Sequence, residues 1–562
     1  MPDEAGPGGG VRGHALAVLA YLALWTAVSW PLATVPFTER LVTRQFDLYA
    51  SMWLVDVAPG TFPRMVSVSS GWPLHEVLTR VDSYVLLGLG WLNHGLLSGR
   101  ALCGLVACLG VPLSAAAAER CAHDGFGVAR PWSWIAGLAY GFSGIAATAL
   151  LEGHVYDLLN PWLPLLWWGF ERGARGDATR RAGLIVGAAF AAALYTSAYF
   201  GVFALMLLIV LSLDAPRVAV RIAPGVALIA LPAGVYYLWL FRMSSRFLDT
   251  DATSPALYLR MGTVAASQLI GWDPLADVAT HSITAALPLL ALPLALGVVA
   301  LPRRTRLLPL LLAALGVIVA LGRTWHLDPG DGGLDLPVDR LLIPALAWFR
   351  FPVRALWLTG LVVGVQAART LGALAPRAPR LAAGALILAV ADAILGPGLP
   401  WRLAAPIGEV PSAYAAIAPG AVLDLWAEPA DRSSGELEMW SRNLTCWYAG
   451  VHGHATPEVC IGTGVKSPRE VLDAWLTHRL LAGNATNVPA TLSAMGFSGV
   501  ALHVDLFRPA DADILQQALT SALGVPLATS TDGGETVVAY AVPAASGPVD
   551  APAVYQRIAA EK

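Results

Sequence analysis

The chain has 562 residues, of which 56% are hydrophobic and only 13% are charged, and its mean hydropathy is +0.60. Soluble domains carry about 25% charged residues, so this composition excludes an ordinary soluble protein and predicts one that crosses a membrane several times. The net charge of −3 argues against a nucleic-acid partner, which would require a basic face.

Apolar segments suited to cross the hydrocarbon core recur between residues 14 and 398, the expected length being about 17–25 residues. The first follows a polar tail over residues 1–13 and lacks a clear cleavage site, so we interpret it as a retained span. The stretch Tyr84–Leu97 is short and glycine-rich, which favours an interfacial or re-entrant helix. We predict about eleven spans, at His14–Ala33, Ala101–Ala118, Trp132–Leu150, Leu158–Phe170, Ala182–Ala198, Phe200–Leu213, Ile222–Phe241, Thr284–Leu301, Leu307–Leu321, Ala355–Ala368 and Leu381–Leu395.

The basic residues of the short loops orient these spans, because Lys and Arg gather on the cytoplasmic side. If the N-terminus is cytoplasmic, every basic cluster of a short loop falls on the cytoplasmic side. Counting Tyr84–Leu97 as a further span would move all these clusters to the outer side. The residues concerned are Arg120, Arg130, Arg172, Arg175, Arg180, Arg181, Arg217, Arg221, Arg303, Arg304, Arg306, Arg369, Arg377 and Arg380.

A long polar loop, residues 34–100, separates the first two predicted spans and is expected on the outer side. It contains QFDLYASMW, which places Asp47 close to the membrane surface beside Tyr49 and Trp53. An ionisable group held there is a candidate for function, and the alternative is an ordinary solvated loop charge. We count Asp47 as the candidate catalytic group and Trp53 as a candidate substrate-binding side chain.

A second polar group, Glu152, His154 and Asp157, lies in the short turn EGHVYD between two spans on the same outer side. So short a turn must lie in the headgroup zone or line an aqueous cavity, which makes these residues candidates for substrate binding. The structural alternative is that His154 caps the end of a helix.

A third group, Arg350 and Arg354, lies in WFRFPVR at the start of a late span. Two guanidinium groups four residues apart suit contact with phosphate oxygens, whereas the alternative is ordinary snorkelling of the side chains to the interface. The three groups together suggest a site for a phosphorylated lipid, at which a carboxylate can act as general base. A divalent cation, Mg²⁺ or Mn²⁺, could bridge acid and phosphate, although no spacing requires one.

Residues 399–546 read as alternating short strands and helices, which predicts a mixed α/β domain on the outer side. The strands are expected in GAVLDLWAE, VALHVDL and ETVVAYAV, and the helices in SPREVLDAWLTHRLL, ATLSAM and ADADILQQALTSALG. We expect the last segment, residues 547–562, to be a flexible tail.

Two of the five cysteines, Cys446 and Cys460, fall in this polar C-terminal part. On the outer side of a membrane they favour a short-loop disulfide. Two free thiols and a metal site with His452 and His454 remain alternatives, although no paired CxxC or HxxxH supports a metal.

Four short segments resemble the C-type membrane glycosyltransferases, and more narrowly bacterial membrane proteins of the YfhO kind. They are DLYASMW with Asp47, EGHVYDLLNPWLPLLWW, FRFPVR, and MGFSGVALHVDLFRP in the C-terminal part. The resemblance implies that Asp47 is the catalytic base, that the donor is a polyprenyl-phosphate sugar, and that the outer domain helps to bind acceptor. The chain departs from better-known members in having no adjacent acidic pair in the first outer loop.

The favoured hypothesis is an inverting glycosyltransferase of a bacterial inner membrane, consistent with the composition rich in Ala, Arg and Gly. It would transfer a sugar from the lipid carrier to an envelope glycan, lipid or protein on the outer face. A transporter or flippase would instead place ionisable residues in the span centres. A non-catalytic assembly protein is kept open by the missing acidic pair.

Overall fold

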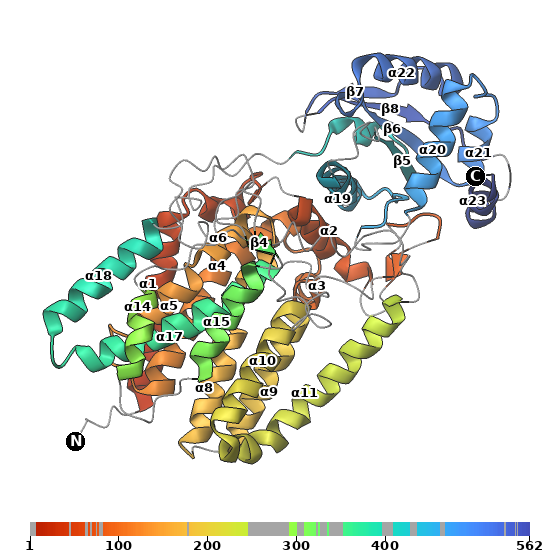
Figure 1. The fold of residues 1–562 in the computed structure, drawn as a ribbon. Coiled ribbons are helices and arrows are strands. Elements are labelled where there is room, and N and C mark those ends of the chain that lie inside the picture. Colours follow the sequence, from red (N-terminus) through yellow and green to blue (C-terminus); the bar gives the residue numbers. More distant parts are fainter. Residues whose placement is uncertain are drawn as a thin grey trace.

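The fold consists of a helical bundle and a smaller α/β domain at the end of the bundle away from the N-terminus (Figure 1). A computed structural model describes residues 7–43, 46–61, 66–67, 70–74, 76–77, 83–176, 179–245, 291–300, 308–321, 324–325, 334–335, 352–395, 409–426, 435–460, 467–532, 535–545, 547 and 549–561. The described residues therefore form a mostly helical part followed by an α/β part, in the predicted order.

Each of the predicted spans overlaps a helix or a pair of short helices. The bundle helices are α1 (Pro7–Val28), α4 (Gly99–Arg120), α5 (Trp134–Gly141), α6 (Gly144–Leu151), α7 (Val155–Leu158), α8 (Trp162–Ala174), α9 (Thr179–Thr196), α10 (Ala198–Asp214), α11 (Pro216–Ser245), α14 (Ala291–Leu296), α15 (Leu308–Leu321), α17 (Leu356–Leu374) and α18 (Pro379–Leu395). Within the described ranges, four helical segments have the length and apolar character of a membrane span, at Gly99–Gly125, Trp134–Leu151, Pro216–Leu240 and Val353–Leu374.

The loop between the first two predicted spans contains two helices, α2 (Phe46–Thr61) and α3 (Tyr84–Asn93). Ser83 caps α3 by accepting a hydrogen bond from the backbone N–H of Leu86. A ten-residue helix rises only about 15 Å, too short to cross the hydrocarbon core, so the interpretation of Tyr84–Leu97 as a non-spanning segment agrees with its observed length.

Helix α4 links the two ends of the bundle. Its 22 residues correspond to about 33 Å, close to the thickness of the hydrocarbon core. At its start the backbone N–H of Gly99 donates to Asp56 of α2 (2.6 Å), and at its end Arg120 contacts Asp124 (3.4 Å). The two ends of α4 therefore place α2 and residues 120–124 at opposite ends of the bundle.

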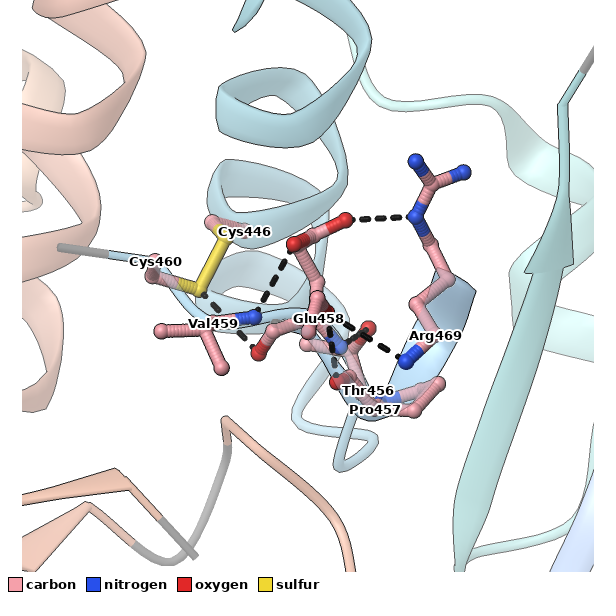
Figure 2. The surroundings of a disulfide bond; sticks show 8 residues. Cys446, Thr456, Pro457, Glu458, Val459, Cys460 and Arg469 are labelled. Atoms are coloured by element: carbon pink, nitrogen blue, oxygen red, sulfur yellow. Dashed lines mark hydrogen bonds and ion pairs between the residues drawn. A yellow bond between two sulfur atoms is a disulfide. The ribbon is translucent and has the colours of Figure 1, made fainter. Parts of the chain in front are cut away.

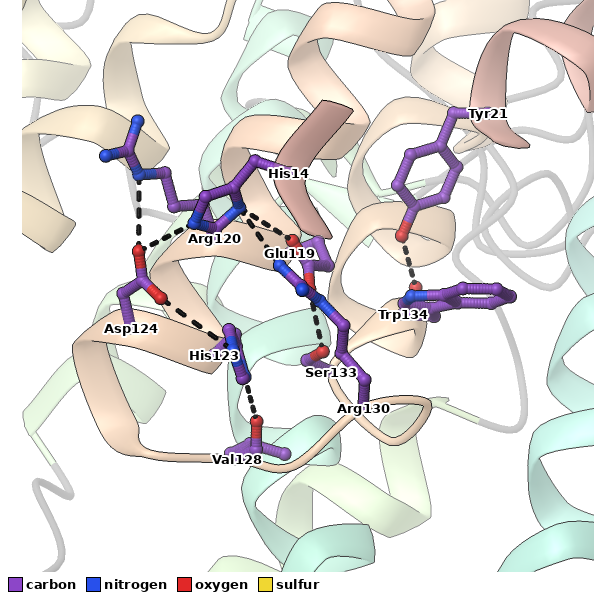
Figure 3. Close-up of polar contacts among 10 residues, drawn as sticks. All are labelled: His14, Tyr21, Glu119, Arg120, His123, Asp124, Val128, Arg130, Ser133 and Trp134. Carbon is purple, nitrogen blue, oxygen red and sulfur yellow. Dashed lines mark hydrogen bonds and ion pairs between the residues drawn. The ribbon is translucent and has the colours of Figure 1, made fainter. Parts of the chain in front are cut away.

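The end of the bundle at the N-terminus holds a polar cluster around Glu119 (Figure 3). Glu119 is fully buried and accepts hydrogen bonds from Arg130 (2.8 Å) and Ser133 (3.0 Å). His14 of α1 contacts Arg130 (3.1 Å) and Asp124 (3.0 Å). These contacts tie the first helix to the end of α4.

Other arginines predicted to lie on the same side as the N-terminus gather at this end. Arg175 donates to the carbonyl of Gly125 (2.7 Å), the Arg369 guanidinium lies 4.6 Å from the Phe126 ring centroid, and Arg120 lies 4.0 Å from that of Trp168. The orientation rule thus identified residues that do share one end of the bundle.

The C-terminal domain is built on a four-stranded sheet with the order β5-β6-β8-β7. The strands are β5 (Ala421–Leu425), β6 (Phe497–His503), β7 (Ala528–Ser530) and β8 (Val537–Ala541). β5 and β6 are parallel, and the other pairs are antiparallel. One face of the sheet packs on α20 (Pro468–Leu481), α21 (Val488–Ala494) and α22 (Pro509–Leu523), while the opposite face meets α19 (Gly435–His452).

The strands and helices expected in this domain are all present, but the expectation of a flexible tail at residues 547–562 is wrong. Residues Ala551–Ala560 form helix α23, and Asp550 caps it by accepting from the backbone N–H of Ala553. Ala551, Val554 and Ile558 are buried in the core beneath the sheet. Their spacing of three and four residues is that of one helical face, in a segment too short to stand out in the sequence.

The predicted disulfide between Cys446 and Cys460 is confirmed (Figure 2). It joins α19 to the segment that follows it, and both cysteines are buried. Beside it, Glu458 accepts from the backbone N–H of Val459 (3.0 Å) and pairs with Arg469 (2.5 Å). The two alternatives, free thiols and a metal site at these cysteines, are therefore wrong.

We predict that the unfolded, unreduced protein exposes only the thiols of Cys103, Cys108 and Cys121 to alkylation and that reduction adds two more. Replacing Cys446 and Cys460 by Ala should cost about 3 kcal/mol, which lowers the Tm of the C-terminal domain by roughly 6–12 °C. Mass spectrometry and thermal unfolding in detergent measure both effects. Cys108→Ala is the control, and labelling of five thiols without reduction would contradict the disulfide.

Candidate functional site

The site begins at helix α2, which is apolar on nearly every side. Leu48, Tyr49, Met52 and Val55 are all at most 3% exposed, and a helix of this kind must be covered by other elements. Asp47 lies in its first turn, where the amide dipoles of a helix N-terminus favour a negative charge. Burial of the helix fixes its backbone and thereby the position of Asp47.

The turn between α6 and α7 packs directly against this first turn of α2. Gly153 has a φ of +79°, and a Cβ added to it would lie 2.6 Å from the backbone nitrogen of Leu48. Only glycine permits both this backbone conformation and so close an approach. The Thr43 hydroxyl donates to the carbonyl of Leu151 (3.2 Å), which holds the same two segments together.

This contact places His154 between two carboxylates. Nε2 of His154 pairs with Asp47, and its Nδ1 lies 3.1 Å from Oε2 of Glu152. The His154 side chain is only 4% exposed, whereas those of Asp47 and Glu152 are 22% and 31% exposed. His154 occupies the N-cap position of α7 but makes no side-chain capping bond. Its two ring nitrogens contact the carboxylates instead.

The histidine is cationic at neutral pH. Burial lowers the pKa of His154, but the Asp47 carboxylate and the hydrogen bonds to Asp47 and Glu152 outweigh it and raise that pKa to about 10. The imidazolium therefore forms an ion pair with the Asp47 carboxylate.

Arg354 and Asp157 form a second ion pair close to His154. Nε of Arg354 lies 2.9 Å from Oδ2 of Asp157, and both side chains are buried. The guanidinium lies 4.7 Å from the Tyr199 ring centroid and 6.0 Å from that of Tyr156. The Tyr156 ring in turn meets that of His154 edge-on at 5.9 Å, so the two ion pairs belong to one site.

The structure thus brings together five of the candidate residues, Asp47, Glu152, His154, Asp157 and Arg354. Snorkelling does not describe Arg354, which is 6% exposed. Arg350 lies outside the described residues. Tyr156 and Tyr199 were missed by sequence reasoning: Tyr156 stands in the same EGHVYD turn and could have been included, whereas no local signal marks Tyr199.

Trp53 was predicted to bind substrate, and the structure places it elsewhere. It is fully buried in a separate apolar cluster with Leu54, Ala58 and the disulfide cysteines. Six residues separate it from Asp47 along α2, which corresponds to a different face of the helix about two turns away. Trp53 therefore anchors α2 against α19 instead of facing the site.

The described part of the chain contains no group of three or more His, Cys, Asp or Glu side chains arranged to hold a metal ion. The cation that lies between the Asp47 and Glu152 carboxylates in this structure is the His154 imidazolium. A divalent cation at the site stays a prediction.

The chain shares its fold with the arabinofuranosyltransferase AftD from Mycobacteria. The two structures align with a TM-score of 0.55 at 15% identity, over 95% of this chain and 40% of the AftD chain. A mutant form of AftD gives a TM-score of 0.57 at 15% identity, over 96% and 42% of the two chains. The present chain therefore spans about two fifths of AftD, and the predicted resemblance to C-type membrane glycosyltransferases is confirmed at the level of the fold.

Two other solved structures align along nearly the whole chain at TM-scores below 0.5. They are ArnT from Cupriavidus metallidurans bound to undecaprenyl phosphate (0.46, 13% identity, 94% of this chain and 99% of that one), and the archaeal oligosaccharyltransferase AglB from Archaeoglobus fulgidus (0.44, 12%, 96% and 75%). No protein family and no curated protein matches the sequence. The narrower resemblance to YfhO-type proteins stays a prediction.

We predict that His154 stabilises the fold in a pH-dependent way. Because its folded pKa of about 10 exceeds the unfolded value of about 6.5, the stabilisation is complete below pH 6.5 and disappears as the pH rises to 10. Thermal unfolding of wild type and His154→Gln should differ most at pH 6 and least at pH 10. A difference that stays constant across this range would contradict a cationic His154.

Proposed function

We propose that this chain is an integral membrane glycosyltransferase that transfers a sugar from a polyprenyl-phosphate carrier to an envelope glycan, lipid or protein. The observation that carries the proposal is the partly exposed Asp47 carboxylate, fixed by His154 beside the buried Arg354. The shared fold with a membrane arabinofuranosyltransferase supports the same reaction class.

In this mechanism the hydroxyl oxygen of the acceptor attacks the anomeric carbon of the donor sugar. The Asp47 carboxylate accepts the proton of that hydroxyl in the same step. The bond between that carbon and the phosphate oxygen breaks, and polyprenyl phosphate leaves with the bonding electrons. Attack from the face opposite the phosphate inverts the configuration. The proton then passes from Asp47 to water, so the reaction needs no further reactant.

The neighbouring residues have supporting roles. His154 orients the Asp47 carboxylate, and Glu152 orients the His154 ring through its other nitrogen. Arg354, held by Asp157 and bounded by Tyr199, is the group we assign to the carrier phosphate, together with Arg350. If a Mg²⁺ or Mn²⁺ binds here, Asp47 and Glu152 would hold it, and it would supply positive charge for the departing phosphate.

We place the site and the C-terminal domain on the outer face of a bacterial inner membrane. The support is the gathering of Arg120, Arg130, Arg175 and Arg369 at the opposite end of the bundle, because such clusters favour the cytoplasmic side. The lipid tail of the carrier would then lie between the spans and its phosphate at the level of Arg354.

We expect Asp47→Asn to lower the transfer rate by about 100- to 10,000-fold, the range typical for loss of a general base, without weakening carrier binding. The assay measures release of polyprenyl phosphate in nanodiscs, with donors starting from the arabinofuranosyl form and extending to other pentoses and hexoses. Assays with EDTA and with added Mg²⁺ or Mn²⁺ test for a cation. Glu39→Gln is the control, because Glu39 lies in the same loop, is 74% exposed and pairs with Arg100.

An unchanged rate in Asp47→Asn would show that the base is another group. Wild-type protein that binds the carrier but transfers none of the donors would favour the assembly role, and movement of the carrier across the bilayer would favour a flippase.

We expect loss of the Arg354 charge to weaken binding of polyprenyl phosphate by about 10- to 100-fold, which corresponds to one charge-assisted hydrogen bond. The double variant Asp157→Asn/Arg354→Gln avoids leaving a buried carboxylate unpaired. Binding is measured in nanodiscs by native mass spectrometry. Arg100→Gln is the control, because Arg100 lies at the same end of the bundle. If the double variant binds polyprenyl phosphate as tightly as the Arg100→Gln control does, Arg354 is not part of the phosphate site.

A further inference from the structure

The C-terminal domain contains a cluster of ionisable side chains on the sheet face that meets α19. Along β5, Leu423 and Leu425 point into the core beneath α20–α22, so the alternation of a strand sends Asp424 to the opposite face. Along β6, Val500 and Leu502 point into the same core and His503 to the opposite face. Neighbouring strands thus place a carboxylate and a histidine side by side.

Five side chains connect there into what we call the His503 network, made of Tyr414, Asp424, Tyr448, His503 and Glu535. Nδ1 of His503 lies 3.0 Å from Glu535 and its Nε2 lies 3.3 Å from Asp424. The Tyr414 hydroxyl contacts both Asp424 and His503, the latter at 3.1 Å. The Tyr448 hydroxyl donates to Oε1 of Glu535 (2.5 Å).

Every member of the network is at most 6% exposed, and the Trp426 ring stacks on His503 at 3.7 Å. Burial lowers the pKa of His503, but the hydrogen bonds to Asp424 and Glu535 raise it to about 9, which makes the ring a cation between two carboxylates. A buried charged network is costly to dehydrate and adds little stability, but it imposes one geometry on the elements that carry it.

The element that the network fixes is α19, through Tyr448. The residue before it, Trp447, stacks on Tyr49 of α2, with ring centroids 5.2 Å apart at 19°. One turn later, a Cβ added to Gly450 would lie 3.4 Å from the Trp53 ring of α2. Helix α19 therefore lies between the sheet and α2.

The chain of contacts ends two residues from the candidate base, since Tyr49 and Asp47 share the first turns of α2. An apolar contact would be enough to hold α19 on the sheet. The directional hydrogen bond from the Tyr448 hydroxyl to Glu535 fixes in addition how far α19 is rotated and shifted. Helix α2 follows because Trp447 stacks on Tyr49 and α19 runs close beside α2 at Gly450.

We propose that the His503 network is a positioning device for the catalytic carboxylate: through α19 and α2 it holds Asp47 in place against His154. Its members are positioning residues, and Tyr448 and Trp447 carry the effect from the C-terminal domain to the site. The assignment to catalysis rests on the proposed transferase function, whereas the mechanical coupling does not.

The test is Tyr448→Phe, which removes one hydroxyl and keeps the ring. We expect amide hydrogen exchange in residues 48–61 to become at least about tenfold faster. The kcat for transfer should fall by about 10- to 100-fold while the KM for the donor changes by no more than about twofold, because a displaced base slows the chemical step without altering carrier binding. Tyr540→Phe is the matched control: Tyr540 is equally buried and bonds to Gln516, but on the opposite face of the same sheet.

A second variant, Trp447→Leu, removes the stack on Tyr49 and keeps all five side chains of the network, and it should reproduce both effects. Unchanged exchange in α2 in both variants would overturn the proposal, as would faster exchange with an unchanged kcat. If wild-type protein transfers no sugar, the proposed function fails while faster exchange in α2 still establishes the coupling, so the two failures are distinguishable.

Discussion

The structure depends on the burial of α2, an apolar helix in the loop between the first two predicted spans. A helix with apolar residues on nearly every side cannot remain in water, so the bundle must cover one side and the C-terminal domain another. Tyr49 meets Trp447 of α19, while Leu48 packs on the turn at Gly153. Because both the bundle and the C-terminal domain cover α2, both together fix the position of the Asp47 carboxylate in its first turn.

Several charged groups buried in the described part of the chain are held by partners of opposite charge, and three places illustrate this. Glu119 meets Arg130 at the N-terminal end of the bundle, and Asp157 meets Arg354 at the other. His503 lies between Asp424 and Glu535 in the C-terminal domain. Such pairs recover their dehydration cost only in good geometry, so each fixes the elements that carry it more than it stabilises them.

The two faces of the C-terminal sheet have different tasks. The face toward α20–α23 is a conventional apolar core that lets the domain fold. The opposite face carries the polar network and belongs, through α19, to the same contiguous core as the bundle. The domain therefore shares a core with the bundle and is not merely attached to it.

The sequence by itself determined the features that depend on local pattern. The apolar runs specified the bundle helices, and the basic residues identified one end of the bundle. The strand and helix periodicities specified most of the C-terminal domain, and the position of Cys446 and Cys460 in this domain predicted that they pair. It also singled out Asp47, Glu152, His154, Asp157 and Arg354, because ionisable groups are rare in such a chain.

Only the tertiary structure decided which of these residues meet. The pairing of Asp47 with His154 requires the glycine turn at Gly153 to approach α2, a contact between segments distant in the chain that no periodicity encodes. Contacts between distant segments also decide that Trp53 packs against α19, away from the site, and that Tyr199 lies beside Arg354 in the site. The tail became helix α23 because α20 and α21 offered an apolar surface to cover, which a short polar-looking segment does not reveal.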